Sequence, residues 1–409
     1  MSASSLDEHR EIVASLLPTM PPLDIALADA HGGMLAADVV AAHDVPAEDV
    51  AAADGYAIRA EDASGARASA PVVLPVAHDA SFDARGARRH VPGTAVRIAS
   101  GAPIPRGADA VVPTAKTDAG VARVAIAQAP RPGDGVRGRG FDVRAAETVL
   151  RAGTRLGARH LALAAMLGIS RLPVHPVPRV VVISVGDELV EPGEMRVEGG
   201  VAEATGHLIS TLIREAGAHA YRVGIVSDDR LALRAAVEDQ LVRADVVVTL
   251  GGLSGARNDT VAEVLGLMGE FEVGSFPLVP GGQHGVGSVS AGGRVVPVIG
   301  LPGRPVAAAV AFESYLRDAL RAMSGHSTGT RATVTATAAQ SWTSPAGVVQ
   351  AVPVLIEEGG SVGATAHLVG DPAAPTMTDL AAANGLVLLP ADATEIRQGT
   401  VLRCIAWDA

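Results

Sequence analysis

The chain contains very little lysine, cysteine or aromatic residue. Lys116 is the only lysine and Cys404 the only cysteine among 409 residues, and aromatic residues make up 2%. A single cysteine excludes an internal disulfide and any metal site made of several thiolates. Few aromatics and a net charge of -11 argue against a nucleic-acid partner, which requires basic and stacking surfaces. A site for anions in this chain must therefore use arginine, backbone N–H groups or a metal ion.

Long apolar runs and targeting signals are also missing. The longest apolar stretches, such as 180–185 and 246–250, are far shorter than the ~18 residues of a membrane-spanning helix. The first residues contain neither the basic region nor the apolar core of a signal peptide. We therefore expect a cytoplasmic protein with no membrane partner. Its length and its 48% hydrophobic content predict roughly two to four domains.

The N-terminal part of the chain changes character along its length. Ser5 is typical of a helix N-cap, and the apolar spacing after it predicts a first helix. A second, Ala-rich helix is expected over 23–40. From about 44 to 137, short Val/Ile stretches divided by Gly and Pro predict a small β-rich domain. The helical pattern returns over 159–167.

Strands and helices alternate from about 178 to 323. Each of four apolar β runs is followed by a loop rich in Gly, Pro or acid and then by a helical pattern; the runs are 179–184, 221–226, 245–250 and 295–299. This repetition predicts a parallel α/β sheet, whose ligands bind beyond the carboxyl ends of the strands. After about 329, short strands and turns predict a small β-barrel or sandwich.

Acidic residues stand in loops over more than half of the chain. They are Asp54, Asp142, Asp187, Glu188, Asp228 and Asp259. Carboxylates gathered from distant loops suit Mg²⁺ on a phosphate-bearing substrate. Each acid also has a purely structural interpretation. An acid before a helix commonly caps it, which fits Asp228-Asp229, and Asp54 and Asp142 fit ordinary turns.

Two further loops are candidates for a functional site. Gly251-Gly252-Leu253-Ser254-Gly255 follows a strand and could present backbone N–H groups to an oxyanion, but taken alone it is better explained as a tight strand-to-helix turn. In Gly300-Leu301-Pro302-Gly303-Arg304-Pro305, two prolines fix the backbone, and Pro305 equally fits the first turn of a helix. The chain has neither a P-loop lysine nor a zinc-binding histidine spacing.

Together these segments resemble one family, over nearly the full length. Ala-Asp-Gly-Tyr-Ala-Ile-Arg at 53–59 resembles its M-D-G-Y-A-V-R element, and Gly-Asp-Glu-Leu at 186–189 resembles G-D-E-L. Further elements match in the same order at 97–112, 138–142, 249–259 and 300–305. The family is that of the molybdenum-insertion enzymes of molybdenum cofactor biosynthesis, bacterial MoeA and the E domain of gephyrin. The chain is a divergent member by this resemblance.

The resemblance implies a multidomain fold of α/β and β type. Residues 1–43 and 138–177 would form an elongated, discontinuous linker domain, and 44–137 an inserted β-rich domain. Residues 178–326 would form a central, MogA-like α/β domain that binds molybdopterin, and 327–409 a C-terminal β-barrel. The resemblance also implies a homodimer, with an active cleft between the α/β domain of one subunit and the second domain of the other.

The resemblance further implies a reaction, its partners and its residues. The reaction is Mg²⁺-dependent insertion of molybdate into adenylylated molybdopterin with release of AMP. A molybdopterin adenylyltransferase would supply the substrate, and acceptor molybdoenzymes would receive the product. Catalytic positions would be Asp54, Asp142, Asp187, Glu188, Asp228 and Asp259, the last four as metal ligands. Cofactor-binding positions would be Ser100, Gly186, Gly251, Gly252, Ser254, Arg257, Pro302, Gly303, Arg304 and Pro305.

The chain departs from the family pattern where the family binds anions. The K-P-G-K element is Val279-Pro280-Gly281-Gly282, so both lysines are absent. The Asn of G-L-P-G-N-P is Arg304, and Arg257 stands in the Gly-rich loop. The D-S-N that precedes a helix is Ala204-Thr205-Gly206. Arginine binds oxyanions in a geometry different from that of lysine, so these changes alter how substrate is held.

Two hypotheses follow from these departures, and a third comes from the α/β domain alone, which resembles a module shared with nucleotide- and pterin-binding proteins. In the first, Arg257 and Arg304 restore anion binding from new positions and the insertion reaction is retained. In the second, the chain is an altered paralogue that binds molybdopterin, a nucleotide or a partner without inserting metal. In the third, the α/β domain hydrolyses a related adenylylated compound. AMP release that does not require molybdate would identify the third.

Overall fold

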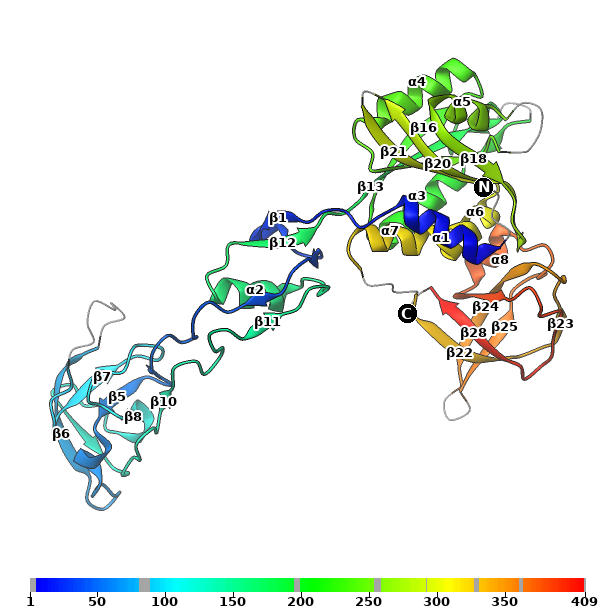
Figure 1. Ribbon diagram of the computed structural model, residues 1–409. Coiled ribbons are helices and arrows are strands. Elements are labelled where there is room, and N and C mark those ends of the chain that lie inside the picture. The colour runs from blue at the N-terminus through cyan, green and yellow to red at the C-terminus, as the bar shows by residue number, and fades with distance from the viewer. Residues whose placement is uncertain are drawn as a thin grey trace. The chain divides into compact units, whose positions relative to one another are not determined.

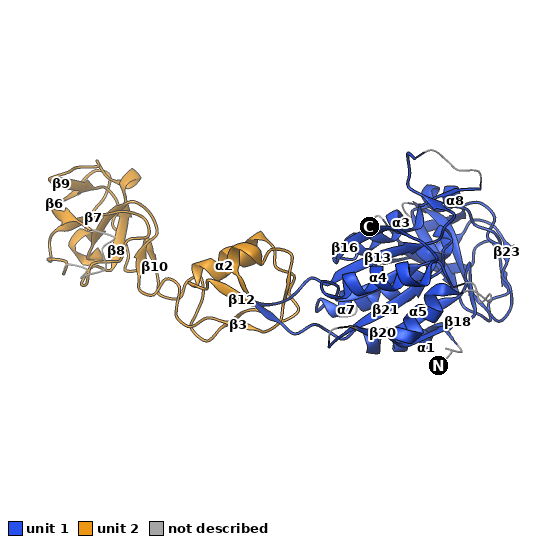
Figure 2. Cartoon of the chain, turned by 90° about the horizontal axis from the view of Figure 1, so that it is seen from above, with its two compact units in different colours: residues 1–24, 173–409 blue, residues 25–172 orange. Residues whose placement is uncertain are grey.

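The computed structural model describes residues 5–80, 89–194, 199–253, 259–291, 293–326, 331–359 and 363–407. The chain forms two compact units, shown in Figure 2. Unit 1 comprises residues 1–24 and 173–409, and unit 2 comprises residues 25–172. The four predicted domain boundaries stay a prediction within this division.

Unit 2 contains a five-stranded sheet of order β8-β5-β7-β6-β9. Its strands are β5 (Gly55–Ile58), β6 (Val72–Asp79), β7 (Ala95–Ile98), β8 (Ala110–Pro113) and β9 (Arg123–Ile126). Successive side chains point to opposite faces, so Tyr56 and Ile58 enter one core cluster and Ala57 enters another. Strands are therefore present where the sequence predicts a β-rich segment.

The helix expected over 23–40 is wrong. This stretch forms β1 (Leu23–Ala26), the 3-10 turn η1 (Leu27–Asp29), β2 (Met34–Leu35) and β3 (Val39–Val40). β12 (Arg171–His175) pairs with β1 and β2, and β11 (Thr148–Leu150) pairs with β3. These pairings lie more than 100 residues away in sequence, so long-range contacts override the helical preference of alanine. The expected helix near 159–167 is present as α2 (Ala158–Met166). Shorter elements of unit 2 are β4 (Val50–Ala51), β10 (Val136–Arg137), η2 (Ala60–Ala63) and η3 (Thr114–Lys116).

Unit 1 is built on a six-stranded sheet of order β16-β13-β17-β21-β20-β18 (Figure 1). The strands are β13 (Arg179–Val185), β16 (His219–Val226), β17 (Val246–Leu250), β18 (Gly269–Gly274), β20 (His284–Ala291) and β21 (Arg294–Leu301). The first four in sheet order are parallel, as predicted, but β20 pairs antiparallel with both of its neighbours, β21 and β18. β20 is rich in glycine, so a search for apolar runs misses it. A Cβ at Gly287 would lie 1.9 Å from the carbonyl oxygen of Glu270 on β18, so glycine is needed there.

Helices cover both faces of this sheet. One face receives α1 (Leu6–Leu16), α3 (Thr205–Glu215), α6 (Pro305–Ala311), the π-helical turn η4 (Phe312–Leu316) and α7 (Arg317–Met323). The other receives α4 (Arg230–Leu241) and α5 (Thr260–Met268). On β13, Val180 and Val182 face the first set while Val181 and Ile183 face the second. All four are 0% exposed, as expected for a strand buried on both faces.

A cluster of four rings joins α1 to the sheet. His9 of α1 stacks on Phe276 with ring centroids 4.5 Å apart and meets Tyr315 edge-on at the same distance. Nδ1 of His284 lies 2.9 Å from the Tyr315 hydroxyl. Burial lowers the pKa of His9 to about 4, and burial together with the charge of His9 lowers the pKa of His284 to about 3. Both imidazoles are therefore neutral near pH 7.

The C-terminal part of unit 1 is a closed five-stranded barrel. Its strands are β22 (Thr333–Ala338), β24 (Val349–Glu358), β25 (Ala364–Leu368), β26 (Gly385–Leu389) and β28 (Val401–Ala406). They follow the order β24-β25-β22-β28-β26, and β26 pairs back with β24. Smaller elements nearby are β19 (Leu278–Val279), β23 (Trp342–Thr343), β27 (Glu395–Ile396) and α8 (Met377–Ala382). Burial raises the pKa of Cys404, inside this barrel, to about 11, so its thiol is protonated and unreactive near pH 7.

None of the helices in the described ranges combines the length and apolarity needed to cross a membrane.

Candidate active site

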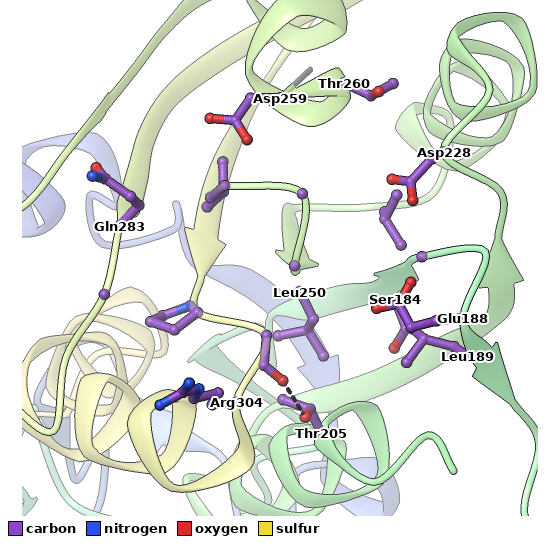
Figure 3. A pocket seen from close by; sticks show the side chains of 18 of the residues that line it. Ser184, Glu188, Leu189, Thr205, Asp228, Leu250, Asp259, Thr260, Gln283 and Arg304 are labelled. Atoms are coloured by element: carbon purple, nitrogen blue, oxygen red, sulfur yellow. Dashed lines mark hydrogen bonds between the residues drawn. The ribbon is translucent and has the colours of Figure 1, made fainter. Parts of the chain in front are cut away.

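A cavity of about 1590 Å³ opens at the carboxyl ends of β13, β17 and β21. Loops that follow these strands line it, together with the loop after β16 and the start of α3. In Figure 3, Asp228 and Glu188 lie on one side of the cavity, and Arg304 and Gln283 lie on the other. The position agrees with the rule that parallel sheets bind ligands beyond their strand ends.

Asp187 and Asp228 are held side by side by reciprocal hydrogen bonds. The N–H of Asp187 donates to Oδ2 of Asp228, and the N–H of Asp228 donates to Oδ1 of Asp187, each at 3.3 Å. The Ser227 hydroxyl also donates to Oδ1 of Asp187 at 2.7 Å. Two loops from neighbouring strands are thereby fixed with their carboxylates together. Adjacent negative charges of this kind favour a cation.

Glu188 folds back over Gly186. A Cβ built on Gly186 would lie 2.6 Å from Oε2 of Glu188, which places that carboxylate directly over the glycine backbone. Glu188 and Asp228 line the cavity, whereas Asp187 stands behind them, bound to Ser227. In the described parts of the chain, no three His, Cys, Asp or Glu side chains are grouped to hold a metal ion by themselves. The predicted four-carboxylate metal set therefore stays a prediction.

The acids before α4 and α5 behave differently from one another. Asp229 caps α4, because its Oδ1 accepts from the N–H groups of Leu231 and Ala232. The structural interpretation is thus confirmed for Asp229. Both Asp228 and Asp229 border the cavity, but the Asp229 carboxylate is engaged in the cap of α4. Asp259 occupies the N-cap position of α5 without a capping hydrogen bond from its side chain, and it lines the cavity.

The glycine loop after β17 adopts conformations that larger residues resist. Gly251 and Gly252 have φ values of +84° and +65°. A Cβ on Gly252 would lie 2.3 Å from Cγ2 of Val261 in α5. The backbone of these two glycines is therefore packed closely against its neighbours, and no side chain of their own covers it at the cavity. The predicted Ser254 and Arg257 lie outside the described residues.

The loop between β21 and α6 supplies the cation of the cavity. Pro305 stands in the first turn of α6, and Arg304 is the N-cap residue, exposed and facing the cavity. The Thr205 hydroxyl donates to the carbonyl of Gly303 at 2.8 Å and fixes this loop to the start of α3. Among the described lining residues there are two arginines, and the second, Arg230, is paired with Glu263 at 2.7 Å. Among the lining residues that the structure describes, Arg304 is thus the arginine without an ion pair to a neighbouring acid.

The segment that replaces the family lysines also borders the cavity. Gly281, Gly282 and Gln283 line it. A Cβ on Gly281 would lie 2.0 Å from the carbonyl oxygen of Leu278, so this position admits only glycine. A Cβ on Gly282 would come within 3.3 Å of the Pro302 ring. Gln283, which no sequence pattern indicated, presents a neutral amide where the family has cationic side chains nearby.

Three predicted site residues lie in unit 2. The N–H of Ser100 donates to Oδ1 of Asp54 at 2.7 Å, so the structure brings these two together. The N–H of Asp142 donates to the carbonyl of Val45 at 2.9 Å. Their roles beside the cavity of unit 1 stay predictions.

Family models match three consecutive parts of the chain. Residues 4–168 match the MoeA N-terminal region, domains I and II. Residues 181–322 match a probable molybdopterin-binding domain. Residues 335–407 match the MoeA C-terminal region, domain IV.

Comparisons of whole sequences and structures agree with these matches. The chain is 37% identical to molybdopterin molybdenumtransferase 2 of Mycobacterium tuberculosis H37Rv over 99% of both chains. It is 35% identical to molybdopterin molybdenumtransferase 1 of the same strain over 97% of both. A crystal structure of the molybdopterin biosynthesis MoeA protein from Pyrococcus horikoshii has a TM-score of 0.81 at 28% identity and covers 99% of each chain. The expected multidomain fold, with its MogA-like central domain and C-terminal barrel, is confirmed, and the chain belongs to the MoeA family of molybdopterin molybdenumtransferases, enzymes of molybdenum cofactor biosynthesis.

Proposed function

We propose that this protein inserts molybdate into adenylylated molybdopterin, with Mg²⁺-dependent release of AMP. The observation that carries the proposal is the division of charge in the cavity. Asp228 and Glu188 stand on one side and Arg304 on the other, around strand-end glycines. The substrates carry phosphates and a separate tetrahedral oxyanion. One wall of the site must hold the metal ion that binds the phosphates, and another must bind the oxyanion.

The acidic wall fits Mg²⁺ in the way that phosphate-bound Mg²⁺ is usually held. This ion commonly takes one or two protein carboxylates, and water and substrate phosphates complete its coordination. Of the carboxylates that line the cavity, Asp228 and Glu188 stand on two loops that a hydrogen bond from the Asp187 N–H to Asp228 holds together, so these two would hold the ion. When bound, Mg²⁺ would supply Lewis-acid charge against the phosphates. Asp187 would not bind the ion directly. Its carboxylate accepts a hydrogen bond from the backbone N–H of Asp228 and so orients the loop that carries Asp228.

The opposite wall would bind molybdate and orient the nucleotide. Arg304 offers five N–H donors in a planar fork, and Gln283 adds a neutral amide on the same side of the cavity. Gly251 and Gly252 leave the backbone open for close approach of substrate. These groups replace the lysines that are absent at Val279 and Gly282. We infer the same context for the protein as for its family: a homodimer in the cytoplasm that receives substrate from an adenylyltransferase and passes product to molybdoenzymes.

The test is AMP release from adenylylated molybdopterin, with and without molybdate and Mg²⁺, followed by activation of an apo-molybdoenzyme. Release that requires both ions and yields an active acceptor supports insertion. Binding of the substrate without release would instead identify the altered paralogue, for which the absent lysines are the specific argument. Release in the absence of molybdate would identify a hydrolase.

Replacing Arg304 with alanine is expected to raise the KM for molybdate by about 10- to 100-fold, because a hydrogen bond to a charged group contributes about 1.5–3 kcal/mol. The KM of Arg304→Lys for molybdate should fall between those of the parent and of Arg304→Ala, because lysine keeps the positive charge but lacks the planar, forked N–H donors of arginine. Arg230→Ala is the matched control: it removes the same charge from the cavity wall, but from a side chain already paired with Glu263. Equal KM changes in Arg304→Ala and Arg230→Ala would contradict the assignment.

A further inference from the structure

Glu203 is a buried carboxylate in the cavity wall that no sequence pattern predicts. Its side chain is 2% exposed, yet it lies among the residues that line the cavity. Oε1 accepts a hydrogen bond from the N–H of Gly206 at 2.6 Å, and Oε2 accepts from Nη1 of Arg222 at 3.0 Å. A buried charge is retained only when it is paired and hydrogen-bonded, and both conditions are met here.

The carboxylate substitutes for a missing helix cap. Helix α3 begins at Thr205, and the N-cap residue Ala204 has no side chain that can accept from the first turn. Glu203 supplies the acceptor from one position earlier. Gly206 makes this arrangement fit, because a Cβ there would lie 2.8 Å from Oε2 of Glu203 and 2.6 Å from the Ser184 hydroxyl. The carboxylate occupies the room that a larger residue at 206 would need.

The first turn of α3 in turn holds the loop that carries Arg304. The Thr205 hydroxyl donates to the carbonyl of Gly303 at 2.8 Å, the hydrogen bond drawn in Figure 3. Gly303 directly precedes Arg304, and it packs so closely on Gly251 that a Cβ at 303 would lie 3.3 Å from the Gly251 Cα. A continuous set of contacts therefore runs from Arg222 through Glu203 and the start of α3 to the backbone of Arg304.

We propose that Glu203 is a positioning residue that sets the place of Arg304 by fixing the first turn of α3. This inference rests on the proposed role of Arg304 as the anion-binding group. Glu203 itself does not touch the anion. Its removal should therefore loosen the Thr205–Gly303 hydrogen bond and weaken anion binding, while the groups on the acidic wall and the chemical step they assist stay in place.

The experiment compares Glu203→Ala, Thr205→Val and the double variant in the full-length protein. Each single change is expected to raise the KM for molybdate about 10-fold and to change kcat by less than about 3-fold. The double variant should be no worse than the more affected single variant, because both act through one hydrogen bond. Conservative changes should restore binding: Glu203→Gln keeps an oxygen for the Gly206 N–H, and Thr205→Ser keeps the hydroxyl. A direct titration with molybdate gives the same comparison without turnover.

Glu191→Gln is the matched control. Glu191 binds the other end of the same guanidinium, with Oε2 at 2.7 Å from Nη2 of Arg222, but it makes no contact with Gly206. Its KM for molybdate should stay within about 2-fold of the parent value. If Glu203→Ala fails to fold, Thr205→Val still tests whether the first turn of α3 holds the Arg304 loop, because it breaks the hydrogen bond to Gly303 and leaves Glu203 in place. An unchanged molybdate KM and affinity in Thr205→Val, or a loss of thermal stability in Glu203→Ala with unchanged affinity, would overturn the inference.

These results are distinguishable from a failure of the proposed function. If the parent protein shows no molybdate-dependent AMP release, or if Arg304→Ala binds molybdate as the parent does, the proposed function is at fault. If the parent is active and Arg304→Ala binds molybdate more weakly while Thr205→Val does not, only the positioning role of Glu203 is refuted.

Discussion

Replacing Asp228 with asparagine is expected to lower kcat for AMP release by about 100-fold or more, which corresponds to about 2.7 kcal/mol of transition-state stabilisation. Asparagine keeps an oxygen that can accept from the N–H of Asp187, so the loops should stay paired. What is lost is the negative charge that faces the cavity. Because weakened Mg²⁺ binding is the expected cause, raising the Mg²⁺ concentration should recover part of the rate.

The neighbouring residue gives an unusually close control for this change. Asp229→Asn removes one charge one position away, but Asp229 serves as the cap of α4, and asparagine caps a helix as well as aspartate. Activity and the midpoint of thermal unfolding should both stay near the parent values. If the two variants lose activity equally, the cavity responds only to total charge, and the specific role of Asp228 is refuted.

Unit 1 is expected to lose about 4 kcal/mol of its free energy of unfolding between pH 7 and pH 5, owing to two buried histidines. Unfolded histidine has a pKa of 6.5, whereas burial lowers the pKa of folded His9 to about 4 and of His284 to about 3. As pH falls below 6.5, the unfolded chain binds protons that the folded chain excludes. At pH 5 each group costs about 2 kcal/mol. The stability is thus complete above pH 6.5 and declines as pH falls toward 4 and 3.

Urea unfolding at a series of pH values, followed by tryptophan fluorescence, measures this effect. Trp342 and Trp407 both belong to unit 1, so their signal reports on the right part of the chain. The carboxylates with lowered pKa, such as Glu191 and Asp245, have unfolded values of 4.5 and 3.8, so their contribution is lost at lower pH. These two carboxylates therefore contribute little between pH 6.5 and 5. Burial raises the pKa of Glu313, also in unit 1, so this carboxyl opposes the histidine effect, and the histidine share is taken from variants.

His9→Phe tests the assignment because it keeps a ring against Phe276 and Tyr315 but cannot bind a proton. The slope of unfolding free energy against pH, between 6.5 and 5, should fall by about half. His367→Phe is the control, since His367 lies half-exposed on the barrel beside Glu357 and belongs to no buried cluster. An unchanged slope in His9→Phe would show that the acid sensitivity arises elsewhere.

The sequence predicted the parallel part of the α/β sheet well, because those strands are buried on both faces. Continuous apolar runs such as 180–185 and 246–250 are typical of strands in that position. Prediction failed where distant contacts decide the structure. The stretch 23–40 looks helical by composition but pairs with strands near 150 and 173. β20 lacks an apolar run because close packing against β18 requires its glycines.

The sequence predicted those lining residues of the candidate site that stand directly after strands, and it missed those placed by distant contacts. Loops at strand ends gave Glu188, Asp228 and Arg304, all of which line the cavity. Spacing alone could not separate Asp228 from Asp229, because a cap and a cavity-facing acid occupy the same kind of position. Glu203 was missed because its role depends on Arg222, 19 residues away, and on the absence of a side chain at Gly206. Only the folded arrangement reveals such compensation.

The discontinuity of unit 1 has a consequence for how the protein is made. Helix α1 places Leu6 and Val13 in the core beside α7, and Nε of Arg10 donates to the carbonyl of Ser314, 304 residues later. At a ribosomal rate of about 5–20 residues per second, this helix waits roughly 15 to 60 seconds for its partners to be synthesised. All of unit 2 emerges during that interval. The apolar residues of this 11-residue segment therefore stay without their partners until translation is nearly finished, and the segment is expected to become a stable helix only when α7 has been made.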